Sequence, residues 1–259
     1  MNYIYGYNFD RESFERELED ILDKSVYDFS SDNVNIFNFD IDSSGSMEDN
    51  GKDRDVIAGL EMYKKSFIDF PESDSIAISL SKFASRYYPV PFENIREFTI
   101  DYHPNGATAL HESIVKSGIF LMAYMTRVTR KNGVIPRATH IVMSDGLPCQ
   151  DRMSFEDSKK IIQELKDAGV TTVFVAFGEA IGSSFGDDLG FDSTIEVKEQ
   201  SELVNFLGVE LSKSCKEQSQ SMKALGANFF SQAVGNKNSE GYSLRTSAVV
   251  DDEDFMDDI

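Results

Sequence analysis

Two kinds of hydrophobic segment alternate along the middle of this chain, and the alternation limits the folds it can adopt. Short apolar runs predict strands at 35–41, from 75, at 138–144, at 170–177 and from 191. Segments with apolar residues at helical spacing predict helices from about 56, from 108, at 154–167 and at 201–215. Strands separated by helices form a mostly parallel sheet covered on both faces. We therefore expect a doubly wound α/β domain with its sites at the carboxyl ends of strands.

The segments outside this pattern predict extensions of the domain. Residues 10–26 predict an amphipathic helix, and 86–90 a short edge strand because its prolines cannot donate to a ladder. The last helix is expected to continue to about 233, and a polar linker then leads to the acidic run DDEDFMDDI. The expected divisions are an N-terminal extension, the main domain, a C-terminal helical extension and a flexible acidic tail, at 1–32, 33–212, 213–234 and 235–259.

Composition excludes several classes of function. The chain has 45 acidic and 25 basic residues and a formal net charge of −20, which opposes binding to nucleic acid or anionic membranes and favours basic partners or cations. The sequence shows neither the start of a signal peptide nor an apolar run of the roughly 18 residues that a membrane span needs. Cys149 and Cys215 match neither a disulfide framework nor a zinc site. We therefore expect a cytoplasmic protein.

Polar residues lie at the ends of three of the predicted elements, at places that a doubly wound sheet can bring together. Asp42, Ser44 and Ser46 follow the first strand, Thr108 begins a helix, and Asp145 follows the 138–144 strand. Two carboxylates and three hydroxyls are hard oxygen donors, and these suit Mg²⁺ or Mn²⁺. A site served largely by neutral hydroxyls and water leaves the cation electrophilic. An Asp or Glu from a protein partner is then the natural sixth ligand.

Three separated motifs agree in order and spacing with a known family. DSSGSM from Asp42, NGATAL from Asn105 and MSDG from Met143 resemble the metal-ion-dependent adhesion site (MIDAS) of von Willebrand factor A (vWA) domains. The resemblance extends over about 33–212 and implies a Rossmann-like vWA fold. It implies that the metal-site residues are Asp42, Ser44, Ser46, Thr108 and Asp145, with the hydroxyls close to the ion and the aspartates partly acting through water.

The resemblance also implies a function. It indicates a divalent-cation-dependent protein-binding module without catalytic activity, acting as a scaffold or regulatory subunit of an intracellular assembly. Intracellular members of the family often work beside ATPases, so an ATPase or a larger assembly is the expected kind of partner. Two positions depart from the family pattern: Asn38 and Asp40 stand in the first strand where apolar residues are usual.

An enzyme is the alternative interpretation of the same first strand. Asp40 and Asp42 match D-x-D-x-[ST], the first motif of haloacid-dehalogenase-like phosphatases, with Asp40 as nucleophile and Asp42 as acid/base. Asp187 and Asp188 would then supply the later acidic motif. This interpretation leaves Ser46 and the NGATAL stretch unexplained, and we expect no enzymatic activity.

Other features allow a simpler interpretation beside the functional one. DSSGSM alone is also typical of a helix N-cap, and a chain can carry the metal-site sequence without using the metal. His111 fits a solvent-facing or hydrogen-bonded helix histidine. The acidic tail is either a solubilising end or a docking peptide, for a partner or for the chain's own metal site. The flanking helices are expected to pack on the domain.

Overall fold

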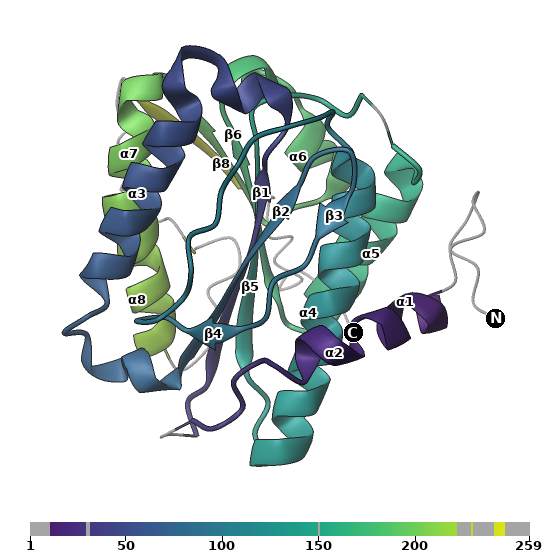
Figure 1. Ribbon diagram of the computed structural model, residues 1–259, viewed down its shortest axis with the longest axis vertical. Helices are drawn as coiled ribbons and strands as arrows, with labels where there is room; N and C mark the ends of the chain where they lie inside the picture. Colours follow the sequence, from purple (N-terminus) through teal and green to yellow (C-terminus); the bar gives the residue numbers. More distant parts are fainter. Residues whose placement is uncertain (1–10, 30–31, 150, 222–228, 230–240, 247–259) are drawn as a thin grey trace, which may run out of the picture.

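The computed structural model describes residues 11–29, 32–149, 151–221, 229 and 241–246, and in these ranges the strands form one mixed sheet (Figure 1). The order across the sheet is β3-β2-β1-β5-β6-β7-β8, and β4 also pairs with β2. Pairing is parallel from β2 to β7 and antiparallel for β3, β4 and β8. The strands are β1 Asn35–Asp42, β2 Ile76–Phe83, β3 Tyr87–Tyr88, β4 Glu93–Asn94, β5 Arg137–Ser144, β6 Thr171–Ala176, β7 Ser193–Val197 and β8 Tyr242–Thr246.

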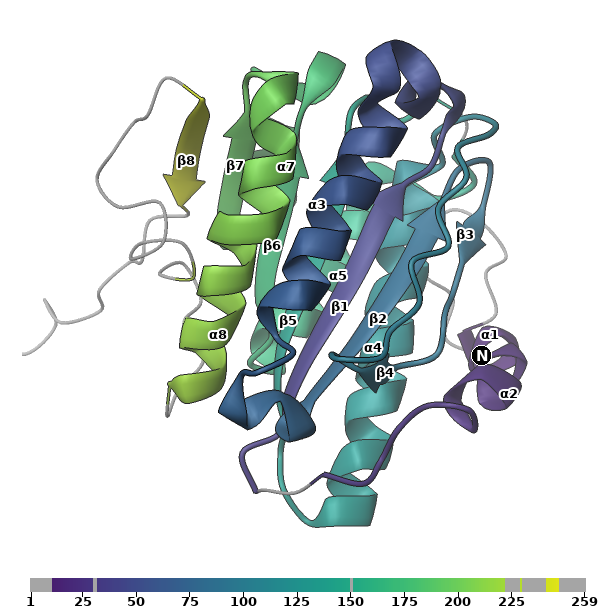
Figure 2. The same cartoon turned by 60° about the vertical axis from the view of Figure 1, so that its left-hand side comes forward.

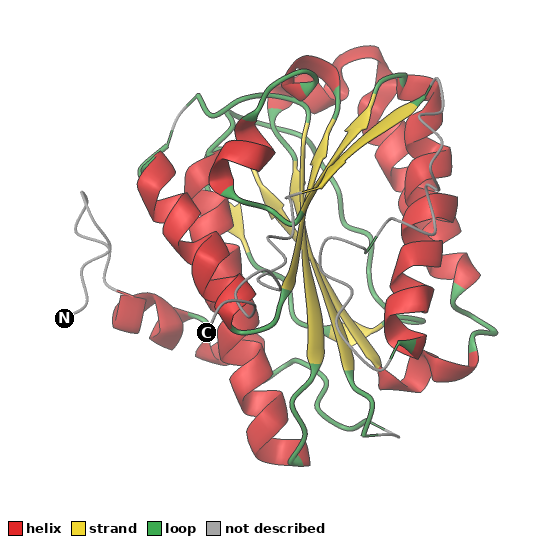
Figure 3. Ribbon diagram, turned by 180° about the vertical axis from the view of Figure 1, so that it is seen from behind, coloured by secondary structure: helices red, strands yellow, loops and turns green. Residues whose placement is uncertain are grey.

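Helices cover both faces of the sheet, as Figures 2 and 3 show from two further sides. On one face lie α3 Lys52–Ser66 and a helical run made of α7 Leu203–Asn205, the π-helical turn η5 Phe206–Leu211 and α8 Ser212–Gln220. On the other lie α4 Leu110–Asn132, α5 Phe155–Asp167 and α6 Phe185–Leu189. Each face buries its own hydrophobic cluster against the sheet. The predicted doubly wound α/β fold is confirmed.

The central strand β1 presents a different chemistry to each face of the sheet. Phe37, Phe39 and Ile41 are fully buried in the cluster beneath α3. Asn38 and Asp40, on the opposite face of the strand, are also fully buried, but under α4. Their polar groups contact serines of α4, whose side chains are spaced one helical turn apart. The polar residues in β1 are therefore matched by a polar stripe on the helix that covers them.

The N-terminal extension packs on the domain, as expected, but as two short helices. These are α1 Arg11–Glu17 and α2 Glu19–Leu22, with Leu18 between them in a nearly helical conformation (φ −79°, ψ −13°). Leu18 and Leu22 are buried in the same cluster as the core face of α4. Arg127 of α4 pairs with Asp23 at 2.6 Å and also with Glu19. Apolar burial and ion pairs thus both hold the extension on α4.

The expected flexible linker within 235–259 is wrong for residues 242–246, which form β8 on the edge of the sheet. Tyr242 bonds to Glu202 and Asn205, both at 2.8 Å, while Arg245 pairs with Asp187 at 2.9 Å and with Glu196 at 3.2 Å. The segment is polar because its side chains bond to charged and polar groups of the domain. The run DDEDFMDDI and most of the expected helix beyond Gln220 lie outside the described residues.

Candidate metal site

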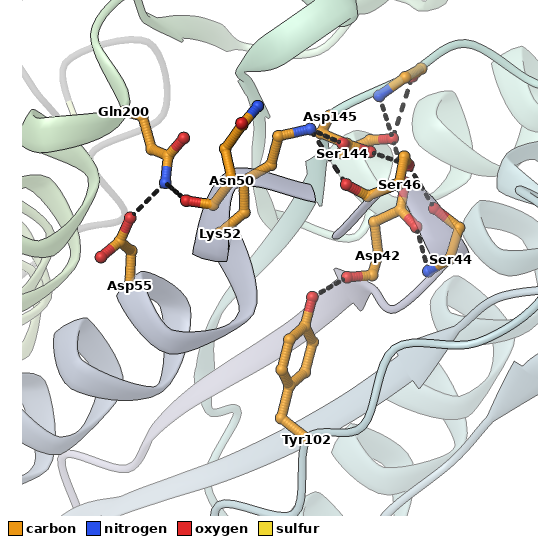
Figure 4. A network of polar contacts seen from close by, with 11 residues as sticks. Asp42, Ser44, Ser46, Asn50, Lys52, Asp55, Tyr102, Ser144, Asp145 and Gln200 are labelled. Carbon is orange, nitrogen blue, oxygen red and sulfur yellow. Dashed lines mark hydrogen bonds and ion pairs between the residues drawn. The ribbon is translucent and has the colours of Figure 1, made fainter. Parts of the chain in front are cut away.

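The predicted site residues from the first and third motifs meet at the carboxyl end of the sheet. Because β1 and β5 are parallel neighbours, Asp42 at the end of β1 lies next to Asp145, which follows β5. Asp42, Ser44 and Asp145 are at most 2% exposed, whereas Ser46 is exposed at the surface. The two serines lie where β1 passes into the helical turn η1 Gly45–Gly51 (Figure 4). The exposed Ser46 hydroxyl therefore lies between solvent and the buried oxygen atoms of Asp42, Ser44 and Asp145.

A chain of hydrogen bonds joins these oxygen atoms. The Ser44 and Ser46 hydroxyls lie 3.0 Å apart, and the Ser46 hydroxyl donates to Asp145 Oδ1 at 2.9 Å (Figure 4). We call Asp42, Ser44, Ser46 and Asp145 the site cluster. Its oxygen atoms come from two loops that are 99 residues apart in the sequence. The fold thus collects hard donors at one point, as a metal site requires.

The Asp42 carboxylate organises the loop that carries the serines. Oδ1 accepts the Ser44 backbone N–H at 2.8 Å, and Oδ2 accepts the Ser144 hydroxyl at 2.6 Å. The Tyr102 hydroxyl donates to the Asp42 backbone carbonyl at 2.5 Å. Because both carboxylate oxygens already accept hydrogen bonds, Asp42 fits a group that stands behind the hydroxyls and acts partly through water.

The loop that carries Thr108 is fastened to the serine loop by its backbone. Gly45 donates its N–H to the Gly106 carbonyl at 2.8 Å, and Asn105 donates to the Ser43 carbonyl at 2.7 Å. Gly106 has φ +93°, and a Cβ there would lie 2.7 Å from the Ser85 hydroxyl, so only glycine fits easily.

Thr108 itself is 6% exposed and lies just past this junction. Its backbone N–H donates to the Cys149 sulfur at 3.3 Å, and its carbonyl accepts from the Cys149 N–H at 3.1 Å. Within the described ranges, no hydrogen bond joins its side chain to the site cluster. The structure therefore brings four of the five predicted residues into contact and places the fifth on an adjoining loop.

A positive charge already lies on this cluster. The Lys52 ammonium, at the start of α3, donates to Asp145 Oδ2 at 2.5 Å and to the Ser46 carbonyl at 3.2 Å (Figure 4). The Lys52 side chain is 15% exposed and that of Asp145 is 1% exposed. A cationic side chain is therefore paired with one of the carboxylates that the sequence assigns to the metal site.

Burial raises the pKa of the Asp42 carboxyl from 3.8 to about 6, although hydrogen bonds from Ser144 and Ser44 act against this. Nearby Asp145 also disfavours a second negative charge. Such a carboxyl is more readily ionised when a cation lies close to it. The electrostatics of the cluster therefore favour a bound positive charge.

The donor set fits a hard divalent cation better than a soft one. In the part of the chain that the structure describes, no group of three or more His, Cys, Asp or Glu side chains is placed to hold a metal ion. The site cluster instead offers two carboxylates and two hydroxyls, with the Lys52 ammonium as a stand-in cation. Such oxygen donors suit Mg²⁺ or Mn²⁺.

Three residues outside the predicted metal-site set complete the site, and of these only Ser144 lies within a motif, MSDG. Lys52 and Tyr102 lie in segments with no recognisable motif, so nothing in the sequence singled them out. Ser144 directly precedes Asp145 at a strand end, and that position was the available signal. Its hydroxyl ties β5 to the Asp42 carboxylate. These residues were missed because each contact depends on the folded arrangement of distant segments.

His111 is a hydrogen-bonded helix histidine, which agrees with the simpler of its interpretations. Its Nδ1 lies 2.9 Å from the buried Ser158 hydroxyl, and its backbone N–H donates to Asp151 Oδ2 at 3.0 Å. Burial lowers the pKa of His111 to about 4, while the charge of Asp157 acts in the opposite direction. These contacts link α4 to α5.

Asp40 lies too deep to be the nucleophile of the phosphatase interpretation. Its side chain is fully buried, and Oδ2 accepts the Ser113 hydroxyl at 2.5 Å. A hydroxyl of α4 thus holds the Asp40 carboxyl group within the core. Asp187, from the proposed later motif, bonds to Thr194 at 2.7 Å and pairs with Arg245. Both aspartates are therefore engaged by neighbouring side chains of the domain.

Comparison with known proteins gives structural likeness without sequence likeness. No family model and no curated protein matches the chain. The pilus adhesin SpaC of Lactobacillus rhamnosus GG superposes with a TM-score of 0.56 at 12% identity, covering 71% of this chain and 31% of SpaC. The PilB minor pilin of Streptococcus sanguinis gives 0.50 at 12% identity, covering 74% of this chain and 63% of PilB.

A third solved structure contains a metal ion. Proximal thread matrix protein 1 from the mussel byssus, described with a zinc-occupied MIDAS motif, gives a TM-score of 0.50 at 14% identity, covering 70% of this chain and 46% of that protein. The chain thus spans less than two thirds of the length of each of these proteins. At these identities the likeness concerns the fold alone. The chain has a vWA-like fold.

Proposed function

We propose that this chain is a divalent-cation-dependent protein-binding module. The observation that carries the proposal is the site cluster at the carboxyl end of β1 and β5, in which hydroxyl and carboxylate oxygens are hydrogen-bonded together beneath an exposed Ser46. The vWA-like fold supports an adhesion or interaction role. The zinc-occupied MIDAS motif of proximal thread matrix protein 1 supports a divalent cation.

In this proposal the chain's own residues prepare a position for Mg²⁺ or Mn²⁺. Ser44, Ser46 and Thr108 hold the ion, and Asp42 and Asp145 stand behind them and orient the hydroxyls. A bound ion supplies a local positive centre that accepts an Asp or Glu side chain from a partner. With a net charge of −20, the protein otherwise repels such a ligand, so its binding depends on the ion.

The setting that we propose is a cytoplasmic assembly in which the chain is a scaffold or regulatory subunit without catalytic activity. The two free cysteines, exposed Cys149 and buried Cys215, support a reducing compartment. The negative charge supports a protein partner, such as an ATPase or a larger assembly, over nucleic acid or membrane. In the described ranges, no helix is both long and apolar enough to cross a lipid bilayer.

Affinity capture tests the proposal when cation dependence and site dependence are measured together. Partner proteins captured with Mg²⁺ or Mn²⁺ are expected to be lost with EDTA and with Ser46→Ala, because the exposed hydroxyl is a proposed ligand of the ion. Asp69→Ala is the matched control, since Asp69 is exposed beyond the far end of α3 and should leave capture unchanged. Capture that survives both EDTA and Ser46→Ala would contradict the proposal.

A further inference from the structure

The Lys52 ammonium occupies a built position on the metal-site carboxylate. It donates to Asp145 Oδ2 at 2.5 Å and to the Ser46 carbonyl at 3.2 Å. Gly178 lies beside this pair: a Cβ there would be 3.5 Å from the Lys52 nitrogen, an ordinary contact, and a tighter 3.0 Å from the Asp145 carbonyl oxygen. The ammonium is therefore bordered by the loops that carry Ser46, Asp145 and Gly178.

The position of Lys52 at the start of its own helix gives the ammonium no electrostatic gain. Lys52 is the first residue of α3, where the helix dipole disfavours a positive charge. Asp53 and Asp55, in the same first turn, are the residue type that this end of a helix favours. A lysine at this position gains from its pairing with Asp145 across the site, not from its helix.

We propose that Lys52 is a resident cation that competes with the divalent ion for Asp145 and so sets the ion affinity of the site. The inference rests on the proposed function, because it concerns the same cluster. Asp145 Oδ2 is either paired with the ammonium or available to neutralise the ion. The ion must therefore displace the lysine or share the carboxylate with it, and either event weakens ion binding.

The surface beside the site gives the displaced lysine a place to go. Lys52 lines a groove of about 400 Å³ together with Phe177, Ile181 and Lys198, between the ends of β6 and β7 and the start of α3. A lysine ammonium sits on a flexible four-carbon stem, so it can turn from Asp145 into this groove while α3 stays in place. In this proposal Lys52 leaves the carboxylate for the groove when the ion binds.

Calorimetric titration of the full chain with Mn²⁺ tests the competition. Lys52→Met keeps much of the apolar stem and removes the charge. It is expected to bind Mn²⁺ about tenfold tighter than the wild type, because a neighbouring positive charge lowers the proton affinity of a carboxylate by a factor of about ten or more and should oppose another cation in the same way. Lys198→Met is the matched control. It removes the same charge from the same groove without a contact to Asp145, so its affinity should stay near that of the wild type.

Two further variants keep the test decisive. Lys52→Gln gives a second neutral side chain if Lys52→Met folds poorly, and Lys52→Arg keeps the positive charge and should keep the weaker affinity. Thermal unfolding with and without Mn²⁺ gives an independent reading. The neutral variants should be less stable than the wild type without metal, because Asp145 has lost its cation, and should gain more stability from Mn²⁺.

The outcomes separate this inference from the proposed function. Equal affinity in the wild type and both neutral variants would overturn the role of Lys52 and leave the metal site standing. No binding by any variant would overturn both. Binding by the neutral variants alone would support Lys52 as the resident cation and contradict metal dependence in the natural chain.

Discussion

Asp40→Asn is expected to abolish most of a pH-dependent destabilisation. In the wild-type protein the free energy of unfolding should fall by about 3 kcal/mol as the pH rises from about 4 to about 7, and in Asp40→Asn this fall should be absent. Burial raises the pKa of the Asp40 carboxyl from 3.8 to about 7, although hydrogen bonds from Ser113 and Ser117 act against this, and the nearby charge of Asp42 raises it further. Oδ1 lies in the core with no hydrogen-bond donor among the described residues. Ionisation of this group in the folded state is therefore costly.

The direction follows from proton counting. Between about pH 4 and pH 7 the unfolded chain has released the Asp40 proton while the folded chain still holds it. The folded state then binds more protons than the unfolded state, so stability falls as the pH rises through this window. Below about pH 4 both states are protonated, and above about pH 7 both are ionised, so the contribution of Asp40 is constant outside the window.

Urea unfolding of the wild type, Asp40→Asn and the exposed control Asp69→Asn at several pH values measures this effect. The free energy of unfolding of Asp40→Asn should rise relative to that of the wild type across the window. Burial also raises the pKa of Asp42, but Asp42 is present in all three proteins and largely cancels. Parallel pH profiles for all three proteins would contradict the prediction, because they would show that ionisation of Asp40 does not destabilise the folded state.

Asp145→Ala is expected to weaken Mn²⁺ binding by about a hundredfold, the upper end of the range for loss of a group that orients metal ligands. Its carboxylate accepts both the Ser46 hydroxyl and the Lys52 ammonium, so the substitution removes an acceptor and the charge that attracts cations. Its backbone carbonyl accepts from Glu179 and Ala180 at 2.7 and 3.1 Å, and these bonds stay. The loop should therefore keep its path.

The matched control for that loss is Glu48→Ala, which removes the same charge from an exposed residue of η1 and should change Mn²⁺ affinity little. Thr108→Ala belongs in the same calorimetric series, because Thr108 is the one predicted ligand whose side chain, among the described residues, is not bonded to the site cluster. It is expected to weaken binding about tenfold. Unchanged Mn²⁺ affinity in Asp145→Ala would show that the ion does not bind at the site cluster.

The sequence predicted the parts of this molecule that follow from local patterns. The alternation of apolar runs and amphipathic segments predicted the parallel sheet with helices on both faces, because each strand and helix carries its own period. Asp42 and Asp145 were identified because each follows a predicted strand, where such sheets place their sites, and because DSSGSM and MSDG resemble the metal-site motif of vWA domains. Site residues at strand ends can therefore be predicted once the order of strands and helices along the chain is known.

What the sequence left open depends on contacts between distant segments. Lys52 contacts Asp145 93 residues away, and Tyr102 reaches Asp42 across 60 residues. The polar residues Asn38 and Asp40 in a buried strand had no explanation in the sequence, because their hydrogen-bond partners are serines of the distant helix α4. The strand β8 was missed because its short, polar sequence lacks an apolar period, and its charged partners lie on the far edge of the domain.

The most direct test of the metal site is a crystal of the protein soaked in Mn²⁺ and measured for anomalous scattering. We expect one peak at the carboxyl end of β1 and β5, within about 2.0–2.3 Å of the Ser44 and Ser46 hydroxyls and close to Thr108 and Asp145, a range typical of hard cations bound by oxygen. The Lys52 ammonium should have moved away from Asp145 in the same map. No anomalous peak at that position, with Lys52 still paired to Asp145 at saturating Mn²⁺, would contradict the proposed metal site.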